Sequence, residues 1–375
     1  MIRKAVILAA GRGTRVQPLT ADLPKPMIPV LGKPVMEYLV EHLARQGVEE
    51  IMVNVSHMAP RIQQYFGDGR RFGLRIGYSF EGHLERGEIV ATPLGSSGAL
   101  RKIHDFGGFI DETTAVLCGD AIVDLDLADA ARVHREQGAL ATVITREVER
   151  HAVSEYGVVV SAGDGRVVSF QEKPTPEAAL SREVSTGIYL IEPGVIDLIP
   201  RDRPHDIGSE LFPELVRREL PFFRQCRDFQ WIDIGRVGDY WRIIQQLMRE
   251  PVPGIDLPGV EVAPGVRVGL NTQVDWSQVY VEGPVYVGSG SSIEPGCTLL
   301  GPVWIGDGCH VEAGAWLERS IVFDYARVGP NGVVKEVIVS GNYCVTRDGK
   351  PLGTAGSATN DEWWSDARAL RAPGR

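Results

Sequence analysis

The feature that most constrains the fold is a repeat of apolar residues between positions 287 and 323. Every sixth residue in this stretch is apolar, without a break. Neither an α-helix nor a flat strand has a period of six, but a triangular coil with three six-residue sides does. The repeat therefore predicts a parallel β-helix. Its apolar positions are Val287, Ile293, Leu299, Ile305, Val311, Leu317 and Phe323.

Residues eighteen positions apart are expected to stack from one turn of this coil to the next. Val287, Ile305 and Phe323 would then form one interior column. The pattern continues upstream, with one extra residue, through Val262, Val268, Val274 and Val281.

The same spacing predicts which side chains face outward. Tyr286, Trp304 and Val322 occupy equivalent outward positions and are expected to form an exposed apolar stripe. Because such a stripe often marks an interface, we predict a homo-oligomer formed through this domain.

Residues 1 to about 250 instead alternate between strand and helix patterns. Strands are expected at 4–10, 50–55, 114–118 and 139–145, and helices at 34–47 and 127–137. Two further runs, 156–160 and 167–171, are separated by a Gly-Asp-Gly turn and predict a hairpin. This alternation indicates an α/β domain with helices covering the sheet and ligands at the carboxyl ends of its strands.

A proline- and glycine-rich joint at 251–259 separates the two patterns. We expect a catalytic domain at 1–250, a β-helix at 251–346, and a C-terminal tail at 347–375. The sequence does not decide between a short docking helix and a loose tail for the last segment.

Composition excludes several classes of function. The chain carries 39 Lys and Arg against 49 Asp and Glu, a net charge of −10, which disfavours binding to nucleic acid. No apolar run approaches the roughly 18 residues of a membrane span. The five cysteines show no CxxC spacing, so we expect reduced thiols and a cytoplasmic protein.

A glycine-rich turn follows the first predicted strand at Gly11 and Gly13. Such a turn lets backbone N–H groups approach a phosphate. A third glycine for a dinucleotide fingerprint is missing, and so is the Lys-Ser/Thr of a Walker loop. Two cations, Arg15 and Lys25, flank the turn, an arrangement that suits a polyphosphate.

These residues begin a motif, 11–27, that resembles the signature of the sugar-1-phosphate nucleotidyltransferases. Later landmarks of that family follow in order at 94–98, 119–120, 156–158, 172–174, 185–189 and 231–235. The chain is most similar to the mannose-1-phosphate guanylyltransferase group. The resemblance implies a Rossmann-like mixed sheet, followed by a left-handed parallel β-helix.

The resemblance also implies roles for individual residues. Arg15 would stabilise the departing pyrophosphate, and Lys25 would bridge the phosphates. Lys173 would hold the sugar phosphate, and Glu172 would accept hydrogen bonds from sugar hydroxyls. The remaining residues implied at the sugar are Gly157, Thr186 and Gly187.

Asp120 and Asp233 each end an apolar strand. Two carboxylates from separate strand ends suit Mg²⁺, which prefers oxygen ligands and keeps part of its water shell. The family assigns the same role to these positions.

The nucleotide is expected to lie along two loops. The residues implied there are Ala10, Gly11, Gly13, Thr14, Gly95, Ser97 and Gly98. We further predict that Glu81 accepts hydrogen bonds from guanine N1–H and the exocyclic amine, because a carboxylate suits two adjacent donors. Solvent exposure is the alternative for this residue.

The chain departs from the family near the nucleotide. It reads Gly95-Ser96-Ser97-Gly98 where Gly-Thr-Ala-Gly is more usual, and Arg236 replaces a small polar residue. Residues 82–92 resemble an insertion. These differences bear on the choice of base.

The reaction expected is attack of a sugar 1-phosphate on a nucleoside triphosphate, most simply GTP with mannose 1-phosphate giving GDP-mannose. A glucose-1-phosphate enzyme using dTTP, UTP or ATP is the alternative within the class. Two alternatives lie outside this class of enzyme. One is a hexapeptide acyltransferase, whose histidine base would have to be His310, the one histidine in the repeat. The other is an inactive regulatory subunit.

Overall fold

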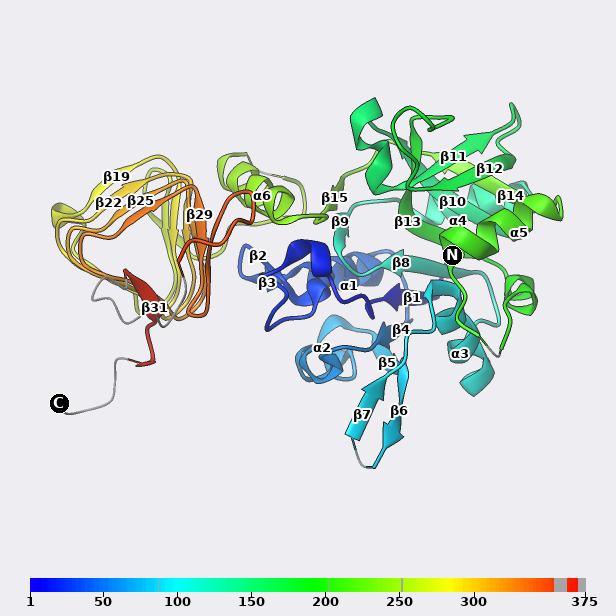
Figure 1. The fold of residues 1–375 in the computed structure, drawn as a ribbon, viewed down its shortest axis with the longest axis horizontal. Helices are drawn as coiled ribbons and strands as arrows, with labels where there is room; N and C mark the ends of the chain where they lie inside the picture. The colour runs from blue at the N-terminus through cyan, green and yellow to red at the C-terminus, as the bar shows by residue number, and fades with distance from the viewer. Residues whose placement is uncertain (87, 202, 251, 354–362, 370–375) are drawn as a thin grey trace. The chain divides into compact units, whose positions relative to one another are not determined.

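The computed structural model describes residues 1–86, 88–201, 203–250, 252–353 and 363–369 (Figure 1). These residues form two compact units. The first consists of Met1–Gly13, Thr20–Ile28 and Pro34–Asp233. The main part of the second unit begins at Ile234, upstream of the proline-rich joint. Two short segments from earlier in the chain, Thr14–Leu19 and Pro29–Lys33, also belong to it.

The first unit is built on a mixed β-sheet, as predicted. On one side lie parallel strands in the order β8–β1–β4–β5. The inner strands β8 and β1 are mostly apolar because both faces of the sheet are covered there, whereas the edge strand β5 is less buried. Their bounds are Lys4–Leu8 (β1), Glu50–Val55 (β4), Arg75–Phe80 (β5) and Thr114–Cys118 (β8).

The rest of the sheet extends from β8 through an antiparallel strand, β13, which also pairs with β10. Strand β10 continues in parallel to β14, and β11 and β12 form the predicted hairpin. The bounds are Ala141–Glu147 (β10), Gly157–Ser161 (β11), Val167–Glu172 (β12), Glu183–Ile191 (β13) and Phe222–Cys226 (β14).

Side chains alternate between the two faces of each strand, so helices cover both. Ala5 and Ile7 of β1 pack with α1, α2 and α4, whereas Val6 packs on the other face with α3 and α5. The helices are α1 (Val35–Arg45), α2 (Ala59–Phe66), α3 (Ser96–Gly107), α4 (Leu127–Glu136) and α5 (Phe212–Arg217).

Shorter pairs of strands complete this unit. The predicted insertion at 82–92 forms a hairpin of β6 (Gly82–Glu85) and β7 (Glu88–Ala91). Strand β9 (Ala121–Val123) pairs antiparallel with β15 (Trp231–Asp233).

The second unit contains the β-helix, whose parallel strands stack in three sheets among the described residues. One is β17 (Val266–Val268), β20 (Val285–Val287), β23 (Val303–Ile305), β26 (Ile321–Val322) and β29 (Val337–Val339). The next is β18 (Gln273–Val274), β21 (Ser292–Ile293), β24 (His310–Val311) and β27 (Ala326–Val328). The third is β19 (Tyr280–Glu282), β22 (Thr298–Leu300), β25 (Trp316–Glu318) and β28 (Val333–Lys335). Left-handed winding stays a prediction.

Much of the predicted register is confirmed. Val287 pairs with Ile305, eighteen residues on. The extra upstream residue is also present, since Val268 pairs with Val287 and Val274 with Ile293.

The register prediction is wrong at both ends of the repeat. Ile305 pairs with Val322, not Phe323, because the corner at Arg319 is one residue shorter than its counterpart at Gly301 and Pro302. Arg319 makes this tight corner with a φ of 44°. Val262 is also not an interior residue: it lies in β16 (Val260–Ala263), which runs antiparallel to β17, and is 49% exposed.

The predicted apolar stripe is likewise wrong. Val322 is an interior residue, and Tyr286 and Trp304 are each only 6% exposed. Their rings stack with centroids 4.2 Å apart. Within the second unit, α6 (Val237–Arg249) packs against this side of the coil: Trp241 Nε1 donates to the Arg319 carbonyl, and Gln245 Nε2 to that of Pro302.

Part of the predicted tail is ordered as a strand. β31 (Trp364–Asp366) pairs antiparallel with β27, and β30 (Cys344–Thr346) pairs antiparallel with β29. No helix in the described ranges has the length and apolar character needed to cross a bilayer.

Candidate active site

The glycine-rich loop leaves the carboxyl end of β1. A Cβ at Gly11 would meet no atom within 4 Å, so the space beside this residue is open. Gly13 has a φ of +60°, and a Cβ there would lie 2.9 Å from Thr20 Cγ2 and 3.0 Å from Lys25 Cβ. Gly13 is therefore needed for the loop to close over Lys25.

Lys25 begins a short 3₁₀ turn, η2 (Lys25–Met27), and reaches the end of β8. Its ammonium group forms an ion pair with the carboxylate of Asp120. The Lys25 side chain is 11% exposed and that of Asp120 is 25% exposed, so the pair is largely shielded from solvent.

The two predicted metal ligands lie at neighbouring strands, Asp120 in the turn between β8 and β9 and Asp233 at the end of β15. Asp233 ends β15 and pairs with Ala121, the residue after Asp120. Gly119 N donates to the Leu8 carbonyl, which holds Asp120 at the carboxyl ends of β1 and β8. The structure thus brings Lys25, Asp120 and Asp233 together at one edge of the sheet.

The Cys118 thiol lies beside this cluster. Burial raises the pKa of Cys118; the nearby carboxylates of Asp120 and Asp233 raise it further, and the Lys25 ammonium group works in the opposite direction. All three charged groups therefore act on the same end of β8.

The predicted sugar-phosphate residues lie at the end of β12. Lys173 Nζ is 3.0 Å from Glu172 Oε1, and the side chains are 50% and 36% exposed. A Cβ at Gly157 would lie 2.3 Å from Phe170 Cζ and 3.3 Å from Glu172 Oε2. Both charged groups are thus accessible to a ligand.

The neighbouring strand β13 contributes Thr186 and Gly187. The Thr186 hydroxyl donates to the Ile144 carbonyl and is buried, so it is occupied within the protein. A Cβ at Gly187, where φ is +74°, would lie 2.9 Å from Cys118 Sγ. Their roles at the sugar stay predictions.

The loop before α3 is less open than predicted. Ser97 is fully buried, and the N–H groups of Ser97 and Gly98 donate to the His205 carbonyl. A Cβ at Gly95 would lie 2.4 Å from that same oxygen. The first turn of α3 is therefore capped by the chain itself.

Glu81 is buried, with 5% of its surface exposed, so the alternative of solvent exposure is excluded. Its carboxylate accepts hydrogen bonds from Asn54 Nδ2 at 2.7 Å and from the Leu94 N–H at 3.2 Å. Both oxygens are thus already engaged.

The remaining predicted nucleotide residues flank Gly11 and Gly13. Ala10 is half-buried at the start of the loop. Thr14 and Arg15 are exposed and lie in η1 (Thr14–Val16). Because these two residues belong to the second compact unit, their place in the site stays a prediction.

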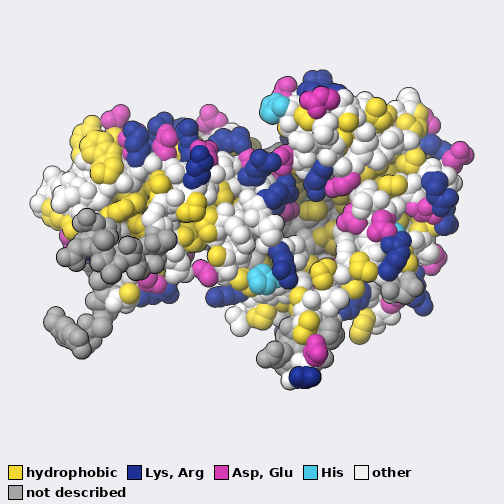
Figure 2. All heavy atoms as spheres, in the orientation of Figure 1, with side chains coloured by type: hydrophobic (Ala, Val, Ile, Leu, Met, Phe, Trp, Pro, Cys, Tyr) yellow, Lys and Arg dark blue, Asp and Glu magenta, His cyan; other side chains and the backbone are white. Residues whose placement is uncertain are grey.

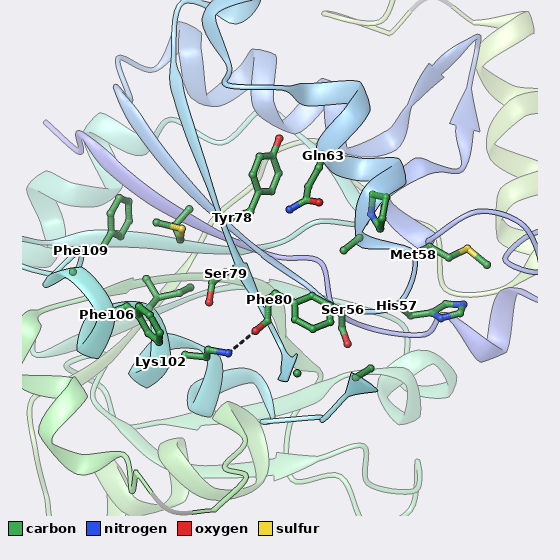
Figure 3. A pocket seen from close by; sticks show the side chains of 17 residues that line it. Ser56, His57, Met58, Gln63, Tyr78, Ser79, Phe80, Lys102, Phe106 and Phe109 are labelled. Atoms are coloured by element: carbon green, nitrogen blue, oxygen red, sulfur yellow. Dashed lines mark hydrogen bonds between the residues drawn. The ribbon is translucent and has the colours of Figure 1, made fainter. Parts of the chain in front are cut away.

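A separate cavity of about 980 Å³ opens along the free edge of β5 (Figure 3). It is lined mainly by apolar residues of β5, α2 and α3, among them Phe80 and Phe106. Lys102 Nζ donates to the Phe80 carbonyl at its rim. None of the predicted site residues lines this cavity.

Sequence reasoning missed His205 and Asp206, which join the loop before α3 to the Glu172 side of the site. The sequence feature that could have indicated them is the pair Ser96 and Ser97, which stands where the family more often has Thr and Ala. Both serine hydroxyls bond to this pair, as Ser96 to Asp206 at 2.6 Å and Ser97 to His205 at 2.7 Å.

Comparison with known proteins agrees with this arrangement. Residues 4–250 match the family model for nucleotidyl transferases, and residues 281–348 match that for the GMPPB C-terminal domain. The chain is 49% identical to a UTP–glucose-1-phosphate uridylyltransferase from Synechocystis, over 97% of this chain and 94% of that protein. It is 33% identical to a mannose-1-phosphate guanylyltransferase from Mycobacterium tuberculosis, over 88% and 82%.

Among solved structures, a UDP-glucose pyrophosphorylase complexed with UDP-glucose shares the fold. The TM-score is 0.54 at 22% identity, covering 65% of this chain and 97% of that one. The sheet edge, its paired lysine and carboxylates, and the family match lead to one conclusion. The chain belongs to the nucleotidyl transferase family, as a sugar-1-phosphate nucleotidyltransferase.

Proposed function

We propose that the protein transfers a uridylyl group from UTP to glucose 1-phosphate, giving UDP-glucose and pyrophosphate. The observation that carries this proposal is the 49% identity to the Synechocystis uridylyltransferase, which extends through both domains. GDP-mannose synthesis is the second candidate, favoured by the guanylyltransferase from M. tuberculosis and by the match at 281–348.

The state of Glu81 bears on the second candidate. Its two carboxylate oxygens accept one hydrogen bond each, from Asn54 and from the Leu94 N–H, away from solvent. These bonds give Glu81 a place within the protein and add no support for the contact expected with guanine. The choice between the candidates therefore rests on the identity to the uridylyltransferase.

The reaction joins a phosphate oxygen of the sugar 1-phosphate to the α-phosphorus and breaks the bond to pyrophosphate. Such a transfer depends on alignment and charge neutralisation more than on covalent help. Lys25 and Arg15 would hold the triphosphate, while Lys173 would hold the sugar phosphate. Glu172, accessible beside Lys173, would accept hydrogen bonds from sugar hydroxyls.

Asp120 and Asp233 fit a magnesium ion. Mg²⁺ is commonly held by one or two carboxylates together with substrate phosphates and water, so a full protein cage is not required. The described residues contain no group of three or more potential metal ligands, in keeping with such an open site. When bound, the ion would supply charge to the phosphates, and Lys25 would be freed to bind them.

Two other classes of function have weaker support. An inactive subunit would be expected to lack charged site residues, yet Lys25, Asp120 and Asp233 are clustered. An acyltransferase base at His310 would need one imidazole nitrogen open to the substrate. Both nitrogens are engaged instead: Nδ1 bonds to Ser292 at 2.6 Å, and Nε2 lies 3.3 Å from Glu294.

The decisive experiment measures pyrophosphate release for UTP, GTP, dTTP and ATP, each with glucose 1-phosphate and mannose 1-phosphate. We expect the highest kcat/KM for UTP with glucose 1-phosphate and loss of activity in Asp120→Asn. A higher value for GTP with mannose 1-phosphate would replace the proposal by the second candidate.

Self-association through the β-helix is also proposed, but on a different face from the predicted stripe. On the outer side of β19, β25 and β28, Tyr280, Trp316 and Val333 are 60%, 42% and 65% exposed. Figure 2 shows hydrophobic side chains gathered over β19 and β22.

The occupant proposed for this face is a second copy of the chain. The next column bears Glu282 at one end and Lys335 at the other, so a two-fold axis would oppose these unlike charges across the interface. Light scattering at micromolar concentration tests this: we expect a dimer for the wild type and a monomer for Trp316→Glu. A monomeric wild type would contradict it.

A further inference from the structure

The segment from His205 to Ser209 is bound to the beginning of α3. The His205 carbonyl accepts from the N–H groups of Ser97 and Gly98, at 3.1 and 2.9 Å, and the His205 N–H donates to the Leu94 carbonyl at 2.8 Å. Gly95, with a φ of +75°, permits this approach, since a Cβ there would lie 2.4 Å from the same carbonyl. The loop before α3 cannot move without this segment.

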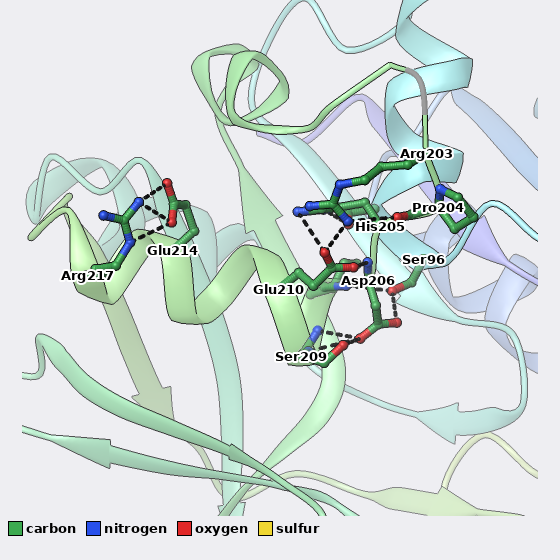
Figure 4. A network of polar contacts seen from close by, with 12 residues as sticks. Ser96, Arg203, Pro204, His205, Asp206, Ser209, Glu210, Glu214 and Arg217 are labelled. Carbon is green, nitrogen blue, oxygen red and sulfur yellow. Dashed lines mark hydrogen bonds and ion pairs between the residues drawn. The ribbon is translucent and has the colours of Figure 1, made fainter.

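Side chains reinforce the backbone contacts (Figure 4). Ser96 Oγ donates to Asp206 and accepts from the Ile207 N–H at 2.8 Å. Ser97 Oγ bonds to His205 Nδ1, with both residues at most 5% exposed. The alanine more usual at position 97 would leave this imidazole nitrogen without that partner.

The other end of the segment lies against Glu172. Asp206 accepts from the N–H groups of Gly208 and Ser209, at 2.9 and 3.0 Å, and so fixes the turn at η6 (Ile207–Leu211). A Cβ at Gly208 would lie 2.5 Å from Glu172 Oε2. This close approach means that the position of Gly208 limits the position of the Glu172 carboxylate.

Asp206 holds this turn as a carboxylate. Burial works to raise the pKa of Asp206, but hydrogen bonds from Ser96, Ser209 and Gly208 outweigh it and lower the pKa. The ionised carboxylate thus accepts from Ser96 on one oxygen and from the Gly208 and Ser209 N–H groups on the other.

We propose that His205 and Asp206 are positioning residues that couple the nucleotide loop at 94–98 to the sugar-binding carboxylate of Glu172. The inference rests on the proposed function for the role of Glu172. Removing the Asp206 carboxylate releases both the Ser96 hydroxyl and the turn that bears Gly208. The affinities for nucleotide and sugar phosphate then change together, although Asp206 touches neither substrate.

The test compares Asp206→Ala, Asp206→Asn and Ser96→Ala with the wild type. We expect Asp206→Ala to raise the KM of both substrates about tenfold, with a smaller change in kcat, since small misplacements of binding groups have effects of at least this size. Asp206→Asn keeps an oxygen for the Gly208 and Ser209 N–H groups, so it should restore both KM values to within about threefold of the wild type.

Glu214→Ala is the matched control. Glu214 lies on the neighbouring helix α5 and pairs with Arg217 and Arg218. Loss of the Glu214 carboxylate should therefore lower Tm and leave both KM values unchanged. If Asp206→Ala moves the KM values no more than Glu214→Ala, or moves only one of them, the coupling is refuted. Should Asp206→Ala fail to fold, Ser96→Ala carries the same test, with both KM values expected to rise about threefold.

The same kinetics distinguish failure of the proposed function from failure of this inference. If the wild-type protein prefers another pair of substrates, the proposed function is wrong, and the variants are then assayed with that pair. Calorimetric titration of nucleotide without sugar phosphate adds a readout independent of turnover. We expect weaker nucleotide binding in Asp206→Ala, and unchanged binding would overturn the inference.

Discussion

Lys25 and Asp120, separated by 95 residues of sequence, form an ion pair at the carboxyl edge of the central sheet. The pair joins the glycine-rich loop to a predicted metal ligand. Each group neutralises the charge of the other in a position largely shielded from solvent.

Replacing Lys25 by Met should reduce kcat/KM by about 10²–10³, the usual effect of removing one electrostatic contact to a reacting group. Lys350→Met is the matched control, since Lys350 is an exposed lysine of the second unit, outside the site and outside the face proposed for self-association. Steady-state kinetics with saturating magnesium measures both. A loss of less than threefold in Lys25→Met would mean that this ammonium does not act on the phosphates.

The two loop glycines should respond differently to alanine. Gly11→Ala meets no protein atom, so Tm should stay unchanged while the KM for nucleotide rises about tenfold, or about 1.4 kcal/mol, if the open space receives the substrate. Gly13→Ala must displace Thr20 or Lys25 and adopt a strained φ, so it should lower both Tm and kcat. Thermal melts and kinetics of both variants distinguish these cases. An unchanged KM in Gly11→Ala would place the nucleotide elsewhere.

Glu81→Gln should destabilise the protein without changing its preference among nucleotides. The glutamine amide cannot accept from both Asn54 Nδ2 and the Leu94 N–H, so one buried donor is left unpaired, at a cost of about 1–3 kcal/mol. Denaturant unfolding measures this cost, with Glu136→Gln as an exposed control. A change in the UTP-to-GTP ratio of kcat/KM would return Glu81 to the role of a base reader.

Stability should decline as the solution is acidified below about pH 6.5. His134 is buried between Thr142 and Glu192. Burial lowers the pKa of His134, although its hydrogen bond to the Glu192 carboxylate works to raise it. The unfolded chain therefore takes up this proton at a higher pH than the folded protein, and folding is disfavoured as the pH falls through that range.

His134→Gln removes this proton uptake, so Tm should fall less between pH 7 and pH 5 than in the wild type. Melting curves of both proteins across this range measure the difference. Parallel Tm profiles for wild type and His134→Gln would show that His134 has no part in acid destabilisation.

The elements that could be predicted from the sequence are those with an unambiguous local pattern. β4 and β8 occupy their predicted ranges because each is a short, mostly apolar stretch buried in the sheet. The β-helix follows from its six-residue period. The loss of one residue at the Arg319 corner could not be read, since Val322 and Phe323 are both apolar and either satisfies the period.

The site divides in the same way. Asp120 follows the end of β8, and parallel topology gathers such residues at one edge of the sheet. Lys25 and Asp233 were predicted from the motifs that carry them. The burial of Glu81 and the contacts of His205 could not be predicted. Both depend on contacts between groups far apart in the sequence. An example is the Ser97 N–H, which donates to the carbonyl of His205, 108 positions later. A repeat in the sequence carries no information on such contacts.

The antiparallel strands at the two ends of one β-helix sheet have a consequence for assembly. β16 begins this sheet and β30 ends it, each reversing direction against its parallel neighbour. The end of a stack of parallel strands presents unpaired backbone N–H and C=O groups, to which a strand of another molecule can add in the same direction. Reversed terminal rungs interrupt that template, so copies of the protein should resist growing into fibres by end-to-end addition.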